Sequence, residues 1–246
     1  MQQFENIISL GWFCGPAQEL TRIGLRSGSY PFDWIGTTMQ NVLELIDNNF
    51  EDLFRYDLLL QQVHVKALYK NERYGFISLH DFSKYEPLSA QIEAVQEKFN
   101  RRIAKFYSAI KKTTLFVRYI YNQKEADYIE NNYDRILATI KKFNKENFIV
   151  FVCHDDVVST IPHTFPVSID EGDFVARRFL EKAPALKEYL CSVYPEEKRN
   201  ENLRYHAEKK KNSRKLLPRL RRKKIRFFNK FRSPYQHDRT YEANDW

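Results

Sequence analysis

The sequence predicts an α/β fold in which helices flank a mostly parallel central sheet in three layers, followed by a basic helical C-terminal tail. Three short apolar runs rich in β-branched and aromatic residues resemble buried strands: residues 6–10, 114–121 and 147–153. Amphipathic helical segments lie between these runs, and helices alternating with strands are typical of parallel sheets. With 246 residues, 43% of them hydrophobic, the chain can bury a full core.

The first half of the chain contains three helical segments and a fourth strand. The first strand runs into Gly11, and a helix-like stretch begins after Cys14. Apolar residues recur on one face over residues 38–54 and again, at spacings of three and four, over residues 89–111, which predicts two amphipathic helices. A strand is predicted between them at residues 74–79, ending at His80.

The second half repeats the alternation of helix and strand. Residues 126–143 have the periodicity of an amphipathic helix. A weaker strand is predicted at residues 164–169, where Pro166 confines it to the edge of a sheet. Residues 174–194 predict a helix that is interrupted near Pro184. Together these elements predict one catalytic α/β domain over residues 1–203.

The residues that could take part in catalysis or binding lie at the carboxyl ends of the predicted strands. Cys14, His80 and His154 each lie just past a strand, and Arg118 interrupts the apolar run of another. Open α/β sheets bind ligands beyond the carboxyl ends of their strands. The sequence therefore predicts a site at this edge.

Cys14 precedes a helix whose first turn contains Pro16, a residue that suits this position because it lacks an N–H group. The free N–H groups and the positive end of the helix dipole stabilise a thiolate and lower the cysteine pKa. A reactive nucleophile is one interpretation. The other is a small apolar side chain packed under the helix.

Two histidines can serve as the base for this thiol. His80 is followed by Asp81, and His154 is followed by two further acids. Either imidazole could accept the thiol proton. A metal site at His154 is not favoured, because one histidine and two successive acids cannot easily face one ion. We expect neither a metal nor another cofactor.

Asp33 and Trp34 lie in a turn-rich aromatic segment, residues 28–36. Asp33 could orient a histidine or bind a substrate hydroxyl, with Trp34 forming a wall of the site. Equally, Asp33 could cap the helix that begins near Thr38. Asp81 is the other candidate for orienting the base.

Arg118 is an unusual residue for a buried strand. Its guanidinium must emerge at the sheet end, where it could bind an anionic substrate, or find a buried carboxylate. The cations within residues 98–103 are interpreted as a solvated helix face.

The three cysteines are widely separated and include no CxxC pair, which indicates neither a zinc ribbon nor a disulfide framework. No signal peptide or run of about 18 apolar residues is present. We therefore expect a cytoplasmic protein.

The net charge of +8 comes from the tail, residues 204–246, where residues 204–232 hold 14 Lys/Arg against one acid. Bulky apolar residues interleave with these cations, as in helices that lie at the inner face of an anionic membrane. A disordered solubilising tail and a nucleic-acid contact are the alternatives. The body of the chain carries no nucleic-acid recognition motif, so we do not expect that partner.

Three segments together resemble a known family: Ser9-Leu10-Gly11 with Cys14, the run Pro31-Phe32-Asp33-Trp34, and His80-Asp81-Phe82. The chain is similar over roughly residues 6–120 to a bacterial family of uncharacterised proteins classed as papain-like cysteine peptidases. The resemblance implies a Cys14 nucleophile, a His80 base and a link to surface-polysaccharide gene clusters. Papain-like enzymes carry the cysteine on a long helix and the histidine on an antiparallel sheet, whereas Cys14 here follows a strand.

Three functional hypotheses follow. The first is a cysteine-dependent hydrolase or acyl transferase acting on a peptide or a sugar-linked acyl group, with Cys14, His80 and Asp33 in catalysis and Trp34, Asp81 and Arg118 at the substrate. The second is a transferase or accessory protein of surface-polysaccharide biosynthesis, in which Arg118 and the pocket at the strand ends bind a phosphorylated or acidic sugar. The third is a non-catalytic binding module recruited to the membrane by its tail.

Overall fold

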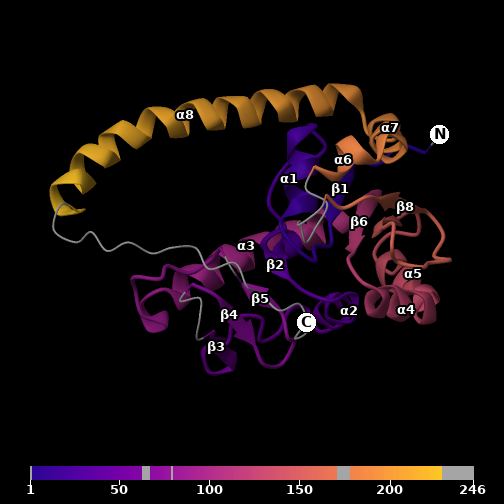
Figure 1. The fold of residues 1–246 in the computed structure, drawn as a ribbon, viewed down its shortest axis with the longest axis horizontal. Coiled ribbons are helices and arrows are strands. Elements are labelled where there is room, and N and C mark those ends of the chain that lie inside the picture. Colours follow the sequence, from indigo (N-terminus) through magenta and orange to yellow (C-terminus); the bar gives the residue numbers. More distant parts are fainter. Residues whose placement is uncertain (1, 63–66, 79, 171–177, 229–246) are drawn as a thin grey trace. The chain divides into compact units, whose positions relative to one another are not determined.

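The computed structural model describes residues 2–62, 67–78, 80–170 and 178–228, the last sixteen of these as backbone only (Figure 1). The chain divides into two compact units, Met1–Arg204 and Tyr205–Trp246.

A four-stranded parallel sheet lies at the centre of the first unit. Its order is β1 (Asn6–Ser9), β6 (Thr114–Ile120), β7 (Phe148–His154) and β8 (Thr164–Val167), and each neighbouring pair is parallel. Because β8 is an edge strand, it tolerates Pro166, which cannot donate a backbone hydrogen bond. The predicted α/β class with a parallel central sheet is confirmed.

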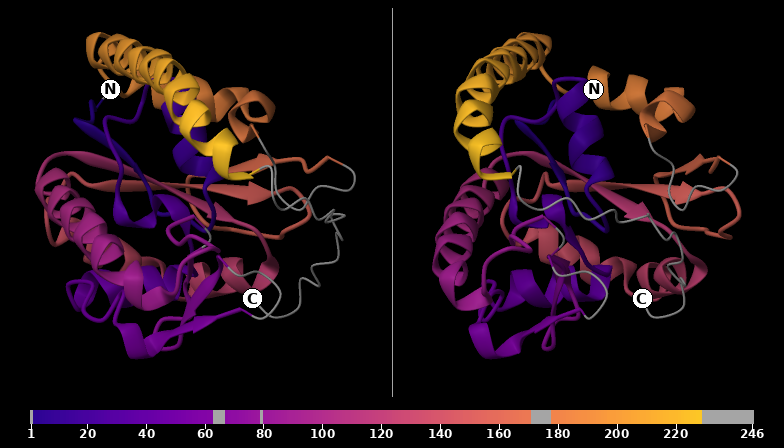
Figure 2. Two further views of the ribbon diagram at one scale, coloured as in Figure 1. Left: turned by 90° about the vertical axis from the view of Figure 1, so that its left-hand side faces the viewer. Right: turned by 60° about the vertical axis from the view of Figure 1, so that its left-hand side comes forward.

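Helices cover both faces of this sheet, which gives three layers (Figure 2). Side chains of β6 alternate between the faces: Leu115, Val117 and Tyr119 enter one core, and Phe116 and Ile120 enter the other. The Leu115 face packs against α1 (Gly15–Arg22), α6 (Phe179–Lys182) and α7 (Pro184–Ser192). The Phe116 face packs against α2 (Met39–Asp47), α3 (Ile92–Ile110), α4 (Gln123–Asn131) and α5 (Tyr133–Lys141).

A second, antiparallel sheet holds the segment before His80. Its order is β2 (Ile35–Gly36), β5 (Ile77–Ser78), β4 (Tyr69–Asn71) and β3 (Leu59–Gln61). Gly75, with φ +64°, closes a tight turn between β4 and β5. Of the strand predicted at residues 74–79, only Ile77 and Ser78 are strand; Tyr74 lies in the turn, and residue 79 lies outside the described part. The expectation that His80 shares a sheet edge with Cys14 is wrong.

Three predicted helices are shorter or broken. The helix predicted at residues 38–54 ends at Asp47, because Asn49, Phe50 and Asp52 all have φ near +60°. The helix predicted at residues 126–143 is two helices, α4 and α5, which meet at Asn132. In the third, the expected interruption near Pro184 separates α6 from α7. Short single-turn helices η1 (Pro31–Trp34), η2 (Tyr56–Leu58) and η3 (Leu88–Ala90) complete the unit.

The last helix, α8, spans Glu196–Phe228 and continues through Pro218 (Figure 1). The basic segment 204–232 is thus helical as far as Phe228, and its last four residues lie outside the described part. Within the described residues, no helix is both long enough and apolar enough to cross a membrane.

Candidate active site

A strained turn joins β1 to α1 and presents Cys14. Gly11 and Trp12 both adopt left-handed backbone conformations, with φ +81° and +78°. Glycine is required at position 11, because an added Cβ would lie 2.7 Å from the carbonyl oxygen of Phe32. Trp12 has no such freedom, so its backbone stores strain, which in proteins is concentrated at functional sites.

Aromatic packing holds this turn against the carboxyl end of β6. The Trp12 ring stacks on Tyr121 with centroids 3.9 Å apart, and the Phe13 ring meets the edge of Tyr119 at 5.0 Å. Gly15 lies so close beneath Phe13 that a Cβ would fall 2.2 Å from its ring. The path of the chain into α1 is therefore fixed on both sides of Cys14.

Cys14 itself is the N-cap residue of α1 and is half-buried. The first helical hydrogen bond runs from the Gln18 N–H to the Cys14 carbonyl, so α1 supplies no acceptor for the N–H groups of Gly15 and Ala17. Such groups stabilise negative charge on an adjacent sulfur or oxyanion. In contrast, burial raises the pKa of the Cys153 thiol to about 11.

His80 lies two residues beyond β5 and is exposed. Its imidazole meets the Trp34 ring edge-on, with centroids 5.9 Å apart. Trp34 ends η1, and η1 contacts α1. His80 and Cys14 are thus carried by segments that both pack on η1.

His154, the rival base, ends β7 and is buried. Its Nε2 lies 2.6 Å from the Tyr119 hydroxyl. Burial lowers the pKa of His154, and the opposing effect of Asp156 and Asp155 is smaller. At neutral pH this imidazole is a neutral partner for a buried tyrosine.

Asp33 is fully buried and is held by partners within its own segment. Its Oδ2 accepts hydrogen bonds from the Arg26 guanidinium and, at 2.6 Å, from the Tyr30 N–H. Burial raises the pKa of this carboxyl, and Arg26 counters the rise. Oδ1 is buried without a hydrogen-bond partner among the described residues. The cap of α2 is Thr38, whose side chain accepts from the Asn41 N–H, so the helix-cap interpretation of Asp33 was wrong.

Asp81 fastens the His80 loop to α3. One oxygen lies 2.6 Å from Lys98 Nζ and 3.7 Å from Arg102, and the other accepts from the Ser78 hydroxyl at 2.8 Å. The interpretation of residues 98–103 as a solvated face therefore holds for Arg101, which is 72% exposed, but was wrong for Lys98 and Arg102.

Arg118 has found the buried carboxylate that its position in a strand requires. Its fully buried guanidinium pairs with Glu125 at 2.6 Å and donates to the carbonyl oxygens of Leu10 at 2.8 Å and Thr37 at 2.6 Å. Glu125 also accepts from the Met39 N–H at 2.9 Å. The pair ties β6 to β1, α2 and α4, and it presents no exposed surface to a substrate.

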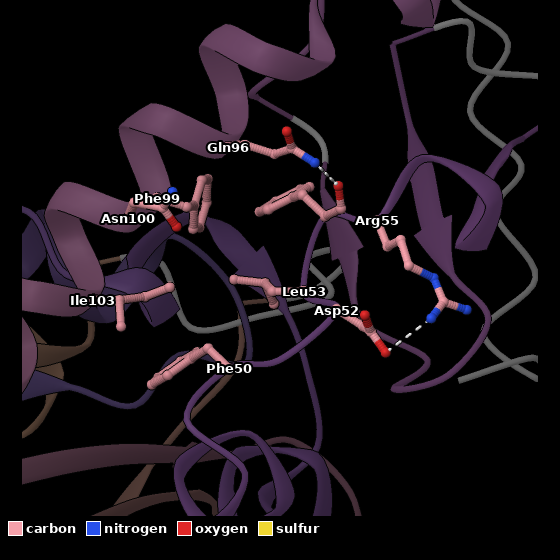
Figure 3. Close-up of a pocket in the computed structure, with 9 residues that line it drawn as sticks. Phe50, Asp52, Leu53, Arg55, Gln96, Phe99, Asn100 and Ile103 are labelled. Atoms are coloured by element: carbon pink, nitrogen blue, oxygen red, sulfur yellow. Dashed lines mark hydrogen bonds and ion pairs between the residues drawn. The ribbon is translucent and has the colours of Figure 1, made fainter.

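A separate pocket of about 290 Å³ lies between α3 and the loop that follows α2 (Figure 3). Gln96, Phe99, Asn100 and Ile103 face it from α3, and Gln96 donates to the Phe54 carbonyl oxygen at 2.7 Å. None of the predicted site residues lines this pocket. In the described part of the chain, no group of three histidine, cysteine or acidic side chains could hold a metal ion.

Sequence reasoning missed the partners Glu125, Tyr119 and Arg26. Only Glu125 left a signal, because a buried arginine demands an acid and Glu125 is one turn into the next helix. Tyr119 and Arg26 meet their partners only after the chain has folded.

Comparisons with known proteins identify a family for this chain. Residues 5–157 match the family described as "Putative papain-like cysteine peptidase". The chain is also 24% identical over 170 residues to "Uncharacterized protein R408" of Acanthamoeba polyphaga mimivirus. This alignment covers 59% of this chain and 76% of the viral protein. This relative is viral, so a bacterial origin stays a prediction. No solved structure matches the chain. Because the match covers more than half of its length and includes Cys14 and His80, the chain belongs to the family described as "Putative papain-like cysteine peptidase".

Proposed function

We propose that this protein is a cysteine-dependent hydrolase or acyl transferase in which Cys14 is the nucleophile and His80 the base. Its substrate would be a peptide or a sugar-linked acyl group. Membership of the family supports a cysteine hydrolase. The observation that carries the proposal is the position of Cys14, at the start of α1 and directly after the strained turn at Gly11 and Trp12.

The proposed reaction uses two successive acyl transfers. The Cys14 thiolate attacks the acyl carbon, which forms a tetrahedral intermediate. Its negatively charged oxygen accepts hydrogen bonds from the N–H groups at the start of α1. Collapse breaks the bond to the leaving group, which takes the proton held by His80. Water, deprotonated by His80, then attacks the thioester, releasing the acid and restoring the thiol. In a transferase, a second acceptor takes the place of water.

Three observations favour His80 over His154 as the base. His80 is exposed, whereas His154 is buried and its Nε2 already faces the Tyr119 hydroxyl. His80 also follows a strand of an antiparallel sheet, as the histidine of papain-like enzymes does, and Cys14 begins a helix. Asp33 and Asp81 then act as positioning residues: Asp33 fixes η1 and its Trp34, and Asp81 fixes the His80 loop on α3.

The alternative role in surface-polysaccharide biosynthesis depended on Arg118 as the ligand for an acidic sugar. Its full burial and its pairing with Glu125 leave that role without support. The peptidase-like proposal is therefore the stronger of the two.

The test is the pH dependence of alkylation by iodoacetamide, read for each cysteine by peptide mass spectrometry. We expect Cys14 to react with an apparent pKa below about 7.5 and Cys153 to stay inert. His80→Ala should raise the apparent pKa of the Cys14 thiol by about one unit or more, and His154→Gln should not. Cys191→Ala is the matched control and should leave the Cys14 profile unchanged. Equal, slow alkylation of Cys14 and Cys191 would contradict the proposal.

A further inference from the structure

Four cations gather around two buried carboxylates beside His80. Arg26 comes from the segment before η1, and Lys98, Arg102 and Lys105 come from successive turns of α3. The carboxylates are Asp33, fully buried, and Asp81, whose side chain is 3% exposed. We call this group the cation cluster.

The contacts within the cation cluster leave positive charge in surplus. Asp33 is occupied by Arg26, and Asp81 is shared between Lys98 at 2.6 Å and Arg102 at 3.7 Å. Arg102 Nη1 is buried without a hydrogen-bond partner among the described residues. Among the described residues, Lys105 forms no ion pair, although the charge of Asp33 acts on it; its Nζ lies 3.3 Å from the Ser27 carbonyl oxygen and above the Tyr30 ring.

The groups of the cation cluster feel each other's charge. Burial is the largest influence on the pKa of Arg102 and lowers it; Asp81 and Asp33 raise this pKa, and Arg26 and Arg101 lower it further. Burial and then Arg26 also lower the pKa of Lys105. Cations that repel one another at the edge of a protein core are costly unless an anion neutralises them.

The cation cluster is also tied to the proposed base. Asp81 follows His80 in the chain, and the Arg26 guanidinium lies 6.0 Å from the centre of the Trp34 ring that meets the His80 imidazole. Arg102 and Lys98 remain partly accessible, with side chains 15% and 31% exposed, and Lys105 is exposed. An anion bound here would lie close to His80, the proposed base.

We infer that the cation cluster binds a phosphate group, carried by the substrate that Cys14 and His80 act on. The assignment of this phosphate to the substrate rests on the proposed function, whereas the anion site itself does not. With both carboxylates ionised, four cations leave two positive charges, which match a dianion better than a single carboxylate. Guanidinium and ammonium groups are the usual protein partners of phosphate oxygens.

The experiment is titration calorimetry of the full chain with inorganic phosphate, with sodium acetate at equal ionic strength as the comparison. We expect phosphate to bind the wild type and Cys14→Ala equally, and acetate to bind at least about tenfold more weakly. Arg102→Gln should weaken phosphate binding about tenfold or more, and Lys105→Gln several-fold. Arg101→Gln, one residue away on the exposed face of α3, is the matched control; it acts on Arg102 only through its charge and should weaken phosphate binding far less than Arg102→Gln.

Absence of phosphate binding, or equal binding by Arg102→Gln and the wild type, would overturn the inference. Phosphate should also slow alkylation of Cys14 in the wild type but not in Arg102→Gln. Binding without this protection would overturn the assignment to the substrate and leave an anion site only. Phosphate binding together with a sluggish Cys14 would reject the proposed function while the anion site stands.

Discussion

Arg118 and Arg102 are both arginines among carboxylates, yet their surroundings differ in kind. Arg118 has Glu125 and two backbone carbonyl oxygens as partners and is fully buried. Arg102 shares Asp81 with Lys98 and keeps a buried nitrogen without a hydrogen-bond partner among the described residues. A saturated guanidinium holds elements together, whereas an unsaturated one is available to a ligand. The predictions below probe this contrast, from the largest expected change to the smallest.

Arg118→Met should be the most damaging substitution. It leaves the Glu125 carboxylate buried without its cation and removes the links to Leu10 and Thr37, so we expect a loss of about 3–5 kcal/mol in the free energy of unfolding. Urea denaturation followed by circular dichroism measures this loss. A variant within 1 kcal/mol of the wild type would show that the pair is not architectural.

Tyr119→Phe should have an intermediate effect. It removes the hydroxyl that faces His154 Nε2 and leaves a buried imidazole nitrogen unsatisfied, at a cost of about 1–3 kcal/mol. The same urea experiment measures it. Tyr121→Phe, which keeps the stack on Trp12, is the control at the next residue but one and should cost less.

Acid should destabilise the fold through His154. Because burial lowers the pKa of His154 in the folded state, the unfolded chain binds a proton more readily. The stabilising contribution is complete above the ordinary histidine pKa of about 6.5 and is lost as the pH falls toward the lower folded value. His154→Gln should flatten the dependence of the melting temperature on pH between 7 and about 5. An unchanged slope would refute this assignment.

Arg102→Gln should barely change stability, in contrast to Arg118→Met. Removing one of the repelling cations of a partly exposed cluster offsets the loss of the contact with Asp81, so we expect a change within about 1 kcal/mol in phosphate-free buffer. Phosphate should raise the melting temperature of the wild type but not of this variant. A loss as large as that of Arg118→Met would erase the distinction between the two arginines.

The tail also carries surplus positive charge. Of the changes considered, its removal should have the smallest effect on the free energy of unfolding of the first unit. Residues 204–232 hold 14 Lys/Arg and one acid. We propose that this segment binds the surface of anionic membranes. Flotation with phosphatidylglycerol vesicles should recover the full chain but not a chain ending at Arg204, and neutral vesicles should recover neither. Unchanged flotation after truncation would remove the tail from membrane binding.

Local patterns predicted the parallel sheet but not the polar network around it. The strands β6 and β7 were evident because each is an apolar run, broken in β6 only by Arg118 and bounded by polar turns. Residues 74–79 misled because aromatic and β-branched residues also fill short strands of a small sheet, and Gly75 folds the segment back after Asn71. The end of α2 was missed because the left-handed residues Asn49, Phe50 and Asp52 include no glycine.

The candidate site was predictable only in part, because pairing is a property of the folded chain. Cys14 could be identified from a local sequence pattern: a strand, a glycine and then a helix with proline in its first turn. The partners of Asp33, Asp81 and Arg118 could not be identified in the same way. For each of these charged groups the sequence offers several side chains of opposite charge, and only the folded chain selects one. Only the requirement that buried charges be paired was certain in advance.

The pairing of β1 with β6 has a consequence for folding during synthesis on the ribosome. Leu10 and Arg118, which meet at the end of this pair, are 108 positions apart in the chain. On the ribosome, the first strand must therefore wait until nearly half of the polypeptide has emerged before its partner is available. The turn at Gly11 and Trp12 packs on Tyr119 and Tyr121, so we expect the surroundings proposed to activate Cys14 to form only late in synthesis.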